Sequence, residues 1–158
     1  MLVKRTEYAI RALISVAIRN RKGERPGFKD VAALIGAPKP FTAKILQEMT
    51  KRGLIKSIRG RGGGFFFDSP PESLTLYQVI KSMEGLSFFT KCAFGFNECS
   101  DEHPCPIHAE YLTFRQGFLD LTKQTTIGAL AGKVIKGEAF LSWSTSMEVP
   151  GSIKLNFF

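Results

Sequence analysis

A glycine-rich run that carries two arginines, residues 57–66, constrains the fold of this chain more than any other segment. Four of its glycines fall within five consecutive positions, and strand-like apolar stretches flank them. Because glycine adopts positive φ angles, the pattern predicts a hairpin with strands at Leu54 to Arg59 and Phe65 to Asp68. We expect Arg59 and Arg61 to project from a narrow tip.

Two helices are predicted at the start of the chain. An apolar stripe with helical spacing marks the first, and we expect Thr6 to cap it. The second should run from about Phe28 to Ile35, with Gly27 as N-cap and Gly36 as the stop. The stripe of the first helix consists of Ile10, Leu13, Ile14, Ala17 and Ile18.

A third helix is predicted from near Pro40 to Gly53, since proline suits the first helical position. Its apolar face should be buried, and it carries Phe41, Ile45, Leu46 and Met49. The opposite face offers small, amide and cationic side chains that can approach a DNA major groove without conflict. Together with the hairpin tip, the candidate DNA-contacting residues are Lys39, Pro40, Thr42, Ala43, Lys44, Gln47, Lys51, Arg59, Arg61, Gly62 and Gly63.

The charge distribution favours contact with nucleic acid. Residues 1–66 hold 15 Lys and Arg against 4 Asp and Glu, whereas residues 67–158 hold 7 against 10, in a chain of net charge +8. Such segregation is the electrostatic footprint of a phosphate-binding surface. With the order helix, turn, helix, hairpin, it predicts a winged helix-turn-helix domain whose partner is double-stranded DNA.

The composition fits a well-cored globular protein, with 158 residues of which 44% are hydrophobic. The apolar stretches are short and interrupted, and the N-terminus lacks the features of a signal peptide. We therefore expect a cytoplasmic protein without a membrane partner. The sequence contains no pairing of nucleophile and base, no cofactor-binding glycine fingerprint and no paired catalytic carboxylates, which argues against an enzyme and against a small-molecule substrate.

Three segments of the sequence resemble the Rrf2 type of bacterial transcriptional regulators: Tyr8 to Leu13, Gly53 to Gly60 and Gly62 to Phe65. The resemblance spans about residues 1–130, and relatives include cluster-assembly, nitric-oxide-sensing and iron-responsive repressors. It implies a homodimeric winged-helix factor that binds pseudo-palindromic operators. Pro40 and Ala43 stand where some relatives place polar base-reading side chains, so the operator sequence does not carry over.

The only three cysteines, Cys92, Cys99 and Cys105, lie close together in one loop. Thiolates are soft ligands that stabilise iron clusters, and three so close in sequence can converge on one inorganic core. The resemblance implies that they hold an iron-sulfur cluster of two or four irons. As fourth ligand it offers His108, for a two-iron cluster, or Glu7 of the partner subunit, for a four-iron cluster; we favour His108.

Other interpretations of the cysteines stay open. Three Cys and one His also satisfy a structural zinc site. A metal-free thiol switch is a further alternative, whereas a disulfide framework conflicts with the expected compartment and the odd number of cysteines. In other classes, the cysteines could serve a small iron-sulfur or thiol oxidoreductase, or stabilise an adaptor that binds only proteins.

Two further helices are expected around the cysteines. Thr75 should cap one that ends at Glu84 and Gly85. After the cysteines, an apolar stripe repeats at helical spacing, and a monomer would leave it partly exposed. We therefore predict a long dimerisation helix, which completes a mainly α fold with a small β-hairpin wing. Its interface residues are Ile107, Tyr111, Phe114, Phe118 and Leu121.

These elements predict a winged helix-turn-helix domain over residues 1–72 and a cysteine loop with a dimerisation helix over 73–132. A C-terminal extension of unknown role covers 133–158, where the stretches 141–143 and 153–158 could be strands, docked arms or disordered ends. Thr125 to Leu130 should begin a short element. The expected function is that of a homodimeric repressor whose operator affinity follows cluster state, in redox, nitric oxide or iron sensing.

Overall fold

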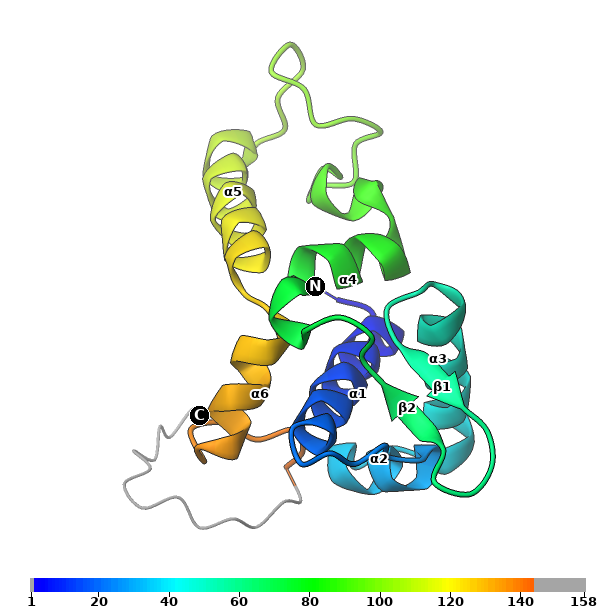
Figure 1. Ribbon diagram of the computed structural model, residues 1–158. Helices are drawn as coiled ribbons and strands as arrows, with labels where there is room; N and C mark the ends of the chain where they lie inside the picture. Colours follow the sequence, from blue (N-terminus) through cyan, green and yellow to red (C-terminus); the bar gives the residue numbers. More distant parts are fainter. Residues whose placement is uncertain (1, 144–158) are drawn as a thin grey trace.

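The computed structural model describes residues 2–143 and confirms the predicted fold class, mainly helical with one antiparallel hairpin (Figure 1). Short 3-10 turns, labelled η, precede and follow α4. The elements are α1 (Lys4–Asn20), α2 (Phe28–Ile35), α3 (Lys39–Lys51), β1 (Lys56–Ile58), β2 (Gly64–Phe66), η1 (Pro71–Ser73), α4 (Leu76–Glu84), η2 (Leu86–Phe89), α5 (His108–Gln124) and α6 (Ile127–Ile135).

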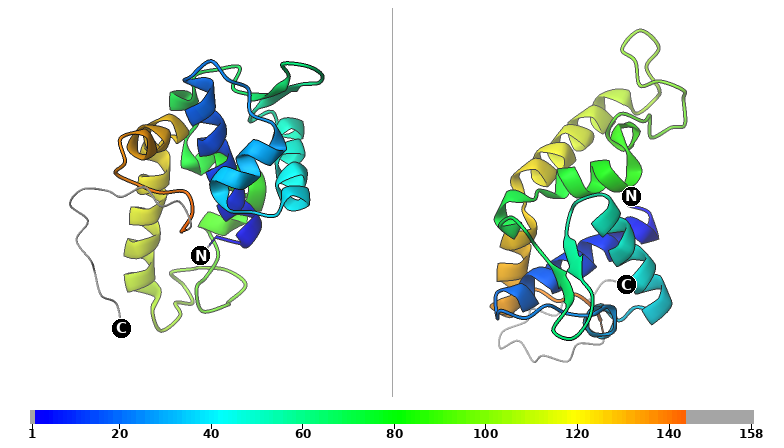
Figure 2. Two further views of the ribbon diagram at one scale, coloured as in Figure 1. Left: turned by 90° about the horizontal axis from the view of Figure 1, so that it is seen from below. Right: turned by 45° about the vertical axis from the view of Figure 1, so that its right-hand side comes forward.

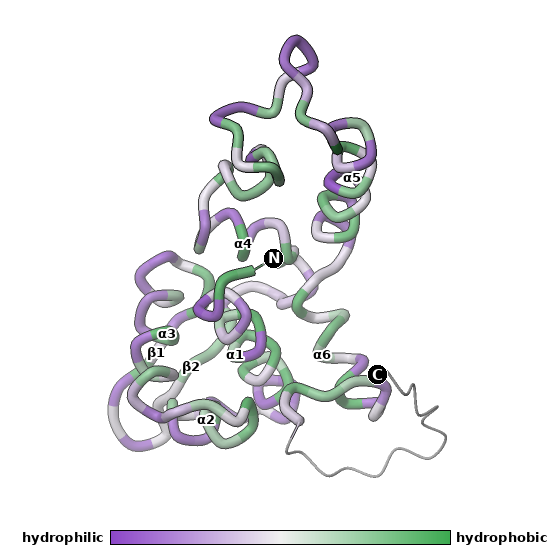
Figure 3. The backbone as a smooth tube through the Cα atoms, turned by 180° about the vertical axis from the view of Figure 1, so that it is seen from behind, coloured by the Kyte–Doolittle hydropathy of each residue, from purple (hydrophilic) through white to green (hydrophobic). Residues whose placement is uncertain are grey.

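Helix α1 forms the centre of the core. All residues from 12 to 17 are buried, so this helix is enclosed on every side. Helices α2, α3, α4 and α6 pack around it. Figure 2 shows α5 rising away from this body with the cysteine loop, residues 90–107, at its far end. In Figure 3 hydrophilic residues dominate the tip of that loop.

The predicted bounds of α2 are exact, and Gly36 ends it with a φ of +64°, a value that glycine adopts without strain. Helix α3 begins at Lys39 with Pro40 in its first turn. The predicted cap of α1 is wrong, because this helix begins at Lys4 with Val3 as N-cap. Thr6 instead faces the core, and its hydroxyl finds no hydrogen-bond partner among the described residues.

The hairpin strands are shorter than predicted. Ser57 pairs with Phe65 in an antiparallel register, and Ile55 packs into the core instead of extending β1. The N–H of Gly63 donates to the carbonyl of Gly60 at 3.0 Å and closes the tip. The strands thus span only the base of the wing, and the glycines form its free end.

Helix α4 has the predicted cap and end. The hydroxyl of Thr75 accepts from the backbone N–H of Gln78, the side chain of Gln78 accepts from the N–H of Thr75, and Gly85 follows the last turn. These reciprocal bonds form a capping box. They fix the start of the helix that leads from the wing to the cysteine loop.

Helix α6 returns from α5 to pack against α1, and Ile127 and Ala131 belong to the same core as the N-terminal helices. The element expected near Thr125 is α6, and Thr126 caps it. Leu141 is buried in the main core. The predicted stretch 153–158 lies outside the described residues.

Candidate functional site

The outer face of α3 is an exposed, cationic surface. Of the candidates on this helix, Lys39, Pro40, Lys44, Gln47 and Lys51 are exposed and Ala43 is half-buried. Ile45, Leu46 and Met49 are buried on the opposite face, as predicted, and Phe41 is half-buried against the ring of Tyr8. The helix therefore presents a mixed amide and cationic surface to solvent.

Thr42 does not belong to that surface. Its side chain is fully buried, and its hydroxyl donates to the carbonyl of Pro38 at 3.0 Å. We correct the prediction that placed Thr42 with the DNA-contacting residues. The reason is angular: position 42 lies between the apolar positions 41, 45, 46 and 49 on the helix surface and turns with them toward the core.

A carboxylate fixes α3 on its neighbours. Glu48 accepts hydrogen bonds from Arg5 in α1 at 2.7 Å and from Arg52 at 2.9 Å, and Arg52 also donates to the carbonyl of Ser82 in α4. Burial raises the pKa of Glu48, but the hydrogen bonds from the two arginines outweigh it and hold the pKa below its ordinary value. Glu48 thereby joins α3 to α1, and Arg52 joins the end of α3 to α4.

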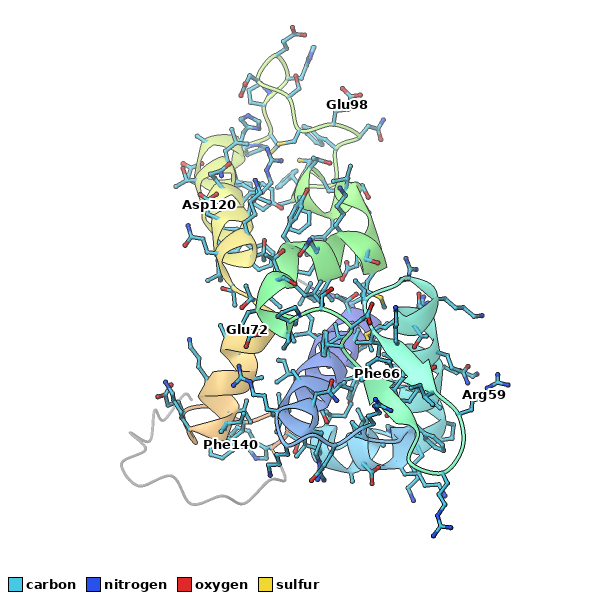
Figure 4. The ribbon with its side chains drawn as sticks, viewed as in Figure 1. Arg59, Phe66, Glu72, Glu98, Asp120 and Phe140 are labelled. Atoms are coloured by element: carbon cyan, nitrogen blue, oxygen red, sulfur yellow. The ribbon has the colours of Figure 1, made fainter. Side chains whose placement is uncertain are left out.

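The wing stands beside α3 with its arginines free. Arg59 and Arg61 are exposed, Gly62 is exposed and Gly63 is half-buried. Figure 4 shows Arg59 extending away from the body of the protein. A groove of about 480 Å³ separates α3 from the wing, lined by Gln47, Thr50, Lys51, Ser57, Ile58, Arg59, Gly64 and Phe65. Helix, groove and wing thus form one continuous surface.

The cysteine loop brings Cys92 and Cys105 together. Both side chains are buried, and Cys105 lies close enough to Cys92 to act on the pKa of its thiol. The pKa of the Cys92 thiol is lowered, first by a hydrogen bond from the backbone N–H of Phe96, against the opposing effect of burial, and further by the N–H groups of Phe94 and Gly95. Backbone amides aimed at a sulfur stabilise its thiolate form.

Cys99 forms a second pair with His108. The sulfur lies 3.6 Å from Nδ1 of His108, and Nε2 of the same ring is bonded to Asp101 at 2.8 Å. Since the carboxylate accepts, Nε2 donates to Asp101, and Nδ1 is the ring nitrogen that faces the sulfur. The carboxylate thereby orients the imidazole, as at many metal-binding histidines.

The four candidate ligands therefore lie in two pairs. Among residues 2–143, no three His, Cys, Asp or Glu side chains surround one point that would hold a single metal ion. The other candidate ligand, Glu7, forms an ion pair with Lys4 at 3.2 Å. A thiol-rich donor set with one oriented imidazole fits an iron-sulfur cluster by its chemistry.

The apolar residues predicted to form a stripe on α5 differ in burial. Phe118 packs toward Phe88 and Phe89 at ring distances of 6.1 and 6.5 Å, and Tyr111 lines the same aromatic groove. Phe114 lines this groove as well, with its ring centre 6.3 Å from that of Tyr111, yet it is 69% exposed, and Leu121 is 57% exposed. Ile107 is the exposed N-cap rather than a helical residue. The most exposed apolar side chains of the predicted interface are therefore Phe114, Leu121 and Ile107.

Several residues of this arrangement escaped the sequence analysis. Asp101 and Glu48 form their contacts through polar side chains that have no periodic pattern. Asp101 lies seven residues before His108, a spacing with no regular meaning in a loop. Glu48 and Arg5 are 43 residues apart. The one signal in the sequence is that the loop contains three acidic residues, Glu98, Asp101 and Glu102.

The helix-turn-helix, the arginine-bearing wing and the exposed face of α3 define a class: winged helix-turn-helix proteins that regulate transcription. A family model described as iron-dependent transcriptional regulator, Rrf2, matches residues 2–133. The chain belongs to the Rrf2 family of transcriptional regulators and is not an enzyme.

Individual relatives agree with this assignment. Protein aau3 of Rhizobium meliloti is 29% identical over 150 residues, 94% of either chain. The regulator IscR of Klebsiella pneumoniae is 25% identical over 129 residues, 82% of this chain and 78% of its own. The structure of CymR, the global cysteine regulator of B. subtilis, aligns with a TM-score of 0.70 at 20% identity, covering 84% of this chain and 96% of CymR. Within residues 2–143, no helix is long and apolar enough to cross a membrane.

Proposed function

We propose that this protein is a homodimeric DNA-binding repressor whose operator affinity is controlled by an iron-sulfur cluster on Cys92, Cys99, Cys105 and His108. The observation that carries the proposal is the separation of two surfaces. A cationic helix and wing lie on one part of the molecule, and the thiol-rich loop lies apart from them, at the far end of α5 (Figure 1). Such a separation suits a regulator that reads a signal at one place and binds DNA at another.

In this proposal, α3 and the wing bind the DNA. Lys39, Lys44 and Lys51 suit phosphates, and Gln47 can pair with a base edge in the major groove. Arg59 and Arg61 suit the adjacent minor groove, whose narrow form attracts arginine. A two-fold dimer through the outer face of α5 would present two such surfaces to the two halves of a pseudo-palindromic operator.

The pairing of the donors supports the two-iron form of the cluster. A two-iron cluster takes two protein ligands on each iron, whereas zinc draws all four to one point. The contacts of Cys92 with Cys105 and of Cys99 with His108 agree with the first pattern. When bound, such a cluster supplies a centre that responds to electrons, nitric oxide and iron supply.

A chain of contacts links the loop to α3. The loop follows α4 through η2, Arg52 at the end of α3 holds the Ser82 carbonyl of α4, and Arg52 shares Glu48 with Arg5. A change in loop structure that moved α4 would therefore act on α3 directly. For effective control, the two cluster states must differ in operator affinity by roughly 10- to 100-fold, about 1.4 to 2.8 kcal/mol.

The test combines metal analysis with DNA binding. Anaerobically purified protein should contain iron and acid-labile sulfide in similar amounts, and removing them should change operator affinity. The Cys92→Ala, Cys99→Ala, Cys105→Ala triple variant should bind operator with one affinity under both conditions. Zinc alone would favour a structural site, and a metal-free protein that responds to oxidant would favour a thiol switch.

DNA binding is tested independently of the metal. Charge reversal at Arg59 and Arg61 should weaken operator binding and flatten its dependence on salt, because each lost phosphate contact reduces the slope of log affinity against log salt by about 0.9. An unchanged slope would contradict the role assigned to the wing.

A further inference from the structure

The wing is held against the end of α1 by one side chain, that of Asn20. Its amide nitrogen donates to the carbonyls of Glu24 at 2.9 Å and Phe65 at 3.3 Å, and its amide oxygen accepts from the backbone N–H of Phe67 at 2.9 Å. Alternate residues of a strand direct their backbone groups to opposite edges. Asn20 therefore satisfies the edge of β2 that faces away from β1.

The turn before α2 completes this grip. The N–H of Phe65 donates to the carbonyl of Pro26 at 2.9 Å, and the guanidinium of Arg25 lies 4.9 Å from the ring centre of Phe66. Gly64 has a φ of +146°, and a Cβ there would lie 2.2 Å from the carbonyl oxygen of Arg25. Asn20 and residues 24–26 thus act on β2 as a third strand would.

A hairpin of two three-residue strands needs such support. Two strands alone are marginally stable in water, so the direction of this wing depends on what holds its base. The glycines at the tip add no stiffness of their own. A small rotation at Phe65 and Phe67 would displace the arginines at the tip relative to α3.

We propose that Asn20 is a positioning residue for DNA binding, which aims the wing so that Arg59 and Arg61 reach DNA while α3 occupies the neighbouring groove. This inference rests on the proposed function, in which α3 and the wing bind the same operator. Asn20 itself need not touch DNA. Its contribution passes through the backbone of β2.

The experiment measures affinity as a function of salt, with an operator fragment selected in vitro by the wild-type protein. Asn20→Ala should weaken binding about tenfold, as three hydrogen bonds are lost, and should reduce the salt slope by about 0.9 for each phosphate contact that the wing gives up. Asn20→Asp keeps the acceptor for Phe67 but turns a carboxylate toward two carbonyls, so it should also weaken binding. Hydrogen exchange at the N–H of Phe67 should accelerate in Asn20→Ala, which removes its acceptor, and less in Asn20→Asp, which keeps an acceptor there.

Two comparisons separate positioning from general destabilisation. Adding Arg59→Ala and Arg61→Ala to Asn20→Ala should weaken operator binding only slightly further, since the wing is already displaced. Thr126→Ala is the matched control, because it also removes a side-chain acceptor from a backbone N–H, at the start of α6, and should leave the salt slope unchanged. Gly64→Ala disturbs the same grip from the wing side and should reproduce the reduced slope if Asn20→Ala fails to fold.

The outcomes show whether the positioning role of Asn20 fails or the proposed DNA-binding function fails. If the two arginine substitutions weaken binding while Asn20→Ala and Gly64→Ala keep wild-type affinity and slope, the positioning role is wrong and the wing contact stands. Full additivity of Asn20→Ala with the arginine substitutions would also overturn it. If the arginine substitutions themselves change nothing, the wing does not contact DNA and the proposed function fails first.

Discussion

His108 faces Cys99 through Nδ1 at 3.6 Å, while Asp101 binds its other ring nitrogen at 2.8 Å. A carboxylate on the far nitrogen fixes the orientation of an imidazole and makes the free nitrogen a stronger ligand. Glu7, the alternative fourth ligand, is already engaged by Lys4 within its own helix. We propose His108 as the fourth ligand, and Glu7 of the partner subunit is the alternative.

The fourth ligand can be identified by substitution. His108→Cys should retain iron and sulfide, because a thiolate replaces the imidazole, and His108→Ala should lose most of both. Glu7→Gln is the control and should keep the wild-type content. Iron and sulfide analysis with visible absorption, all under anaerobic conditions, measures this. Loss of the cluster in Glu7→Gln with retention in His108→Ala would reverse the assignment.

Gln47 and Thr42 should behave differently although both lie on α3. Gln47→Ala should relax base preference at one position of the operator, since a bidentate amide contact gives about 1 to 3 kcal/mol of discrimination. Thr42→Val should lower stability by about 1 kcal/mol through loss of its buried hydrogen bond, with base preference unchanged. Binding to randomised operators and thermal unfolding measure the two effects. A changed base preference in Thr42→Val would contradict its burial.

Glu48 should give the protein an acid-sensitive part of its stability. Because its pKa is lowered by folding, the contribution is present above the ordinary value near 4.5 and is lost as pH falls below it. Glu48→Gln should lower the free energy of unfolding by about 1 to 2 kcal/mol at neutral pH, with a smaller difference in acid. Denaturant unfolding across pH tests this, with Glu110→Gln, an exposed acid on α5, as control. A difference that grows in acid would contradict the sign.

Substitutions at exposed and at packed residues of α5 should have different effects, the first on dimerisation and the second on folding. Phe114→Glu with Leu121→Glu should yield a folded monomer, because both side chains are exposed in the single chain. Phe118→Glu should instead reduce stability, since this ring packs on Phe88 and Phe89. Sedimentation velocity and circular dichroism distinguish the results. A stable dimer of the first variant would exclude the outer face of α5 as the interface.

The sequence by itself determined the local elements of this protein. The stop at Gly36, the capping box at Thr75 and the glycine tip of the wing follow from residues within a few positions of one another, and local backbone preferences decide them. The segregation of charge and the grouping of cysteines are likewise visible in the sequence alone. They sufficed for the fold class and the family.

Only the tertiary structure decided which side chains meet. The sharing of Glu48 between Arg5 and Arg52, the grip of Asn20 on β2 and the two donor pairs in the cysteine loop depend on packing between distant or irregular segments. Periodicity assigned Thr42 to the surface and all of the α5 stripe to one seam. Packing turned Thr42 inward and left the members of the stripe with unequal exposure, because helix faces are buried by the neighbours they contact, and pattern alone does not fix those neighbours.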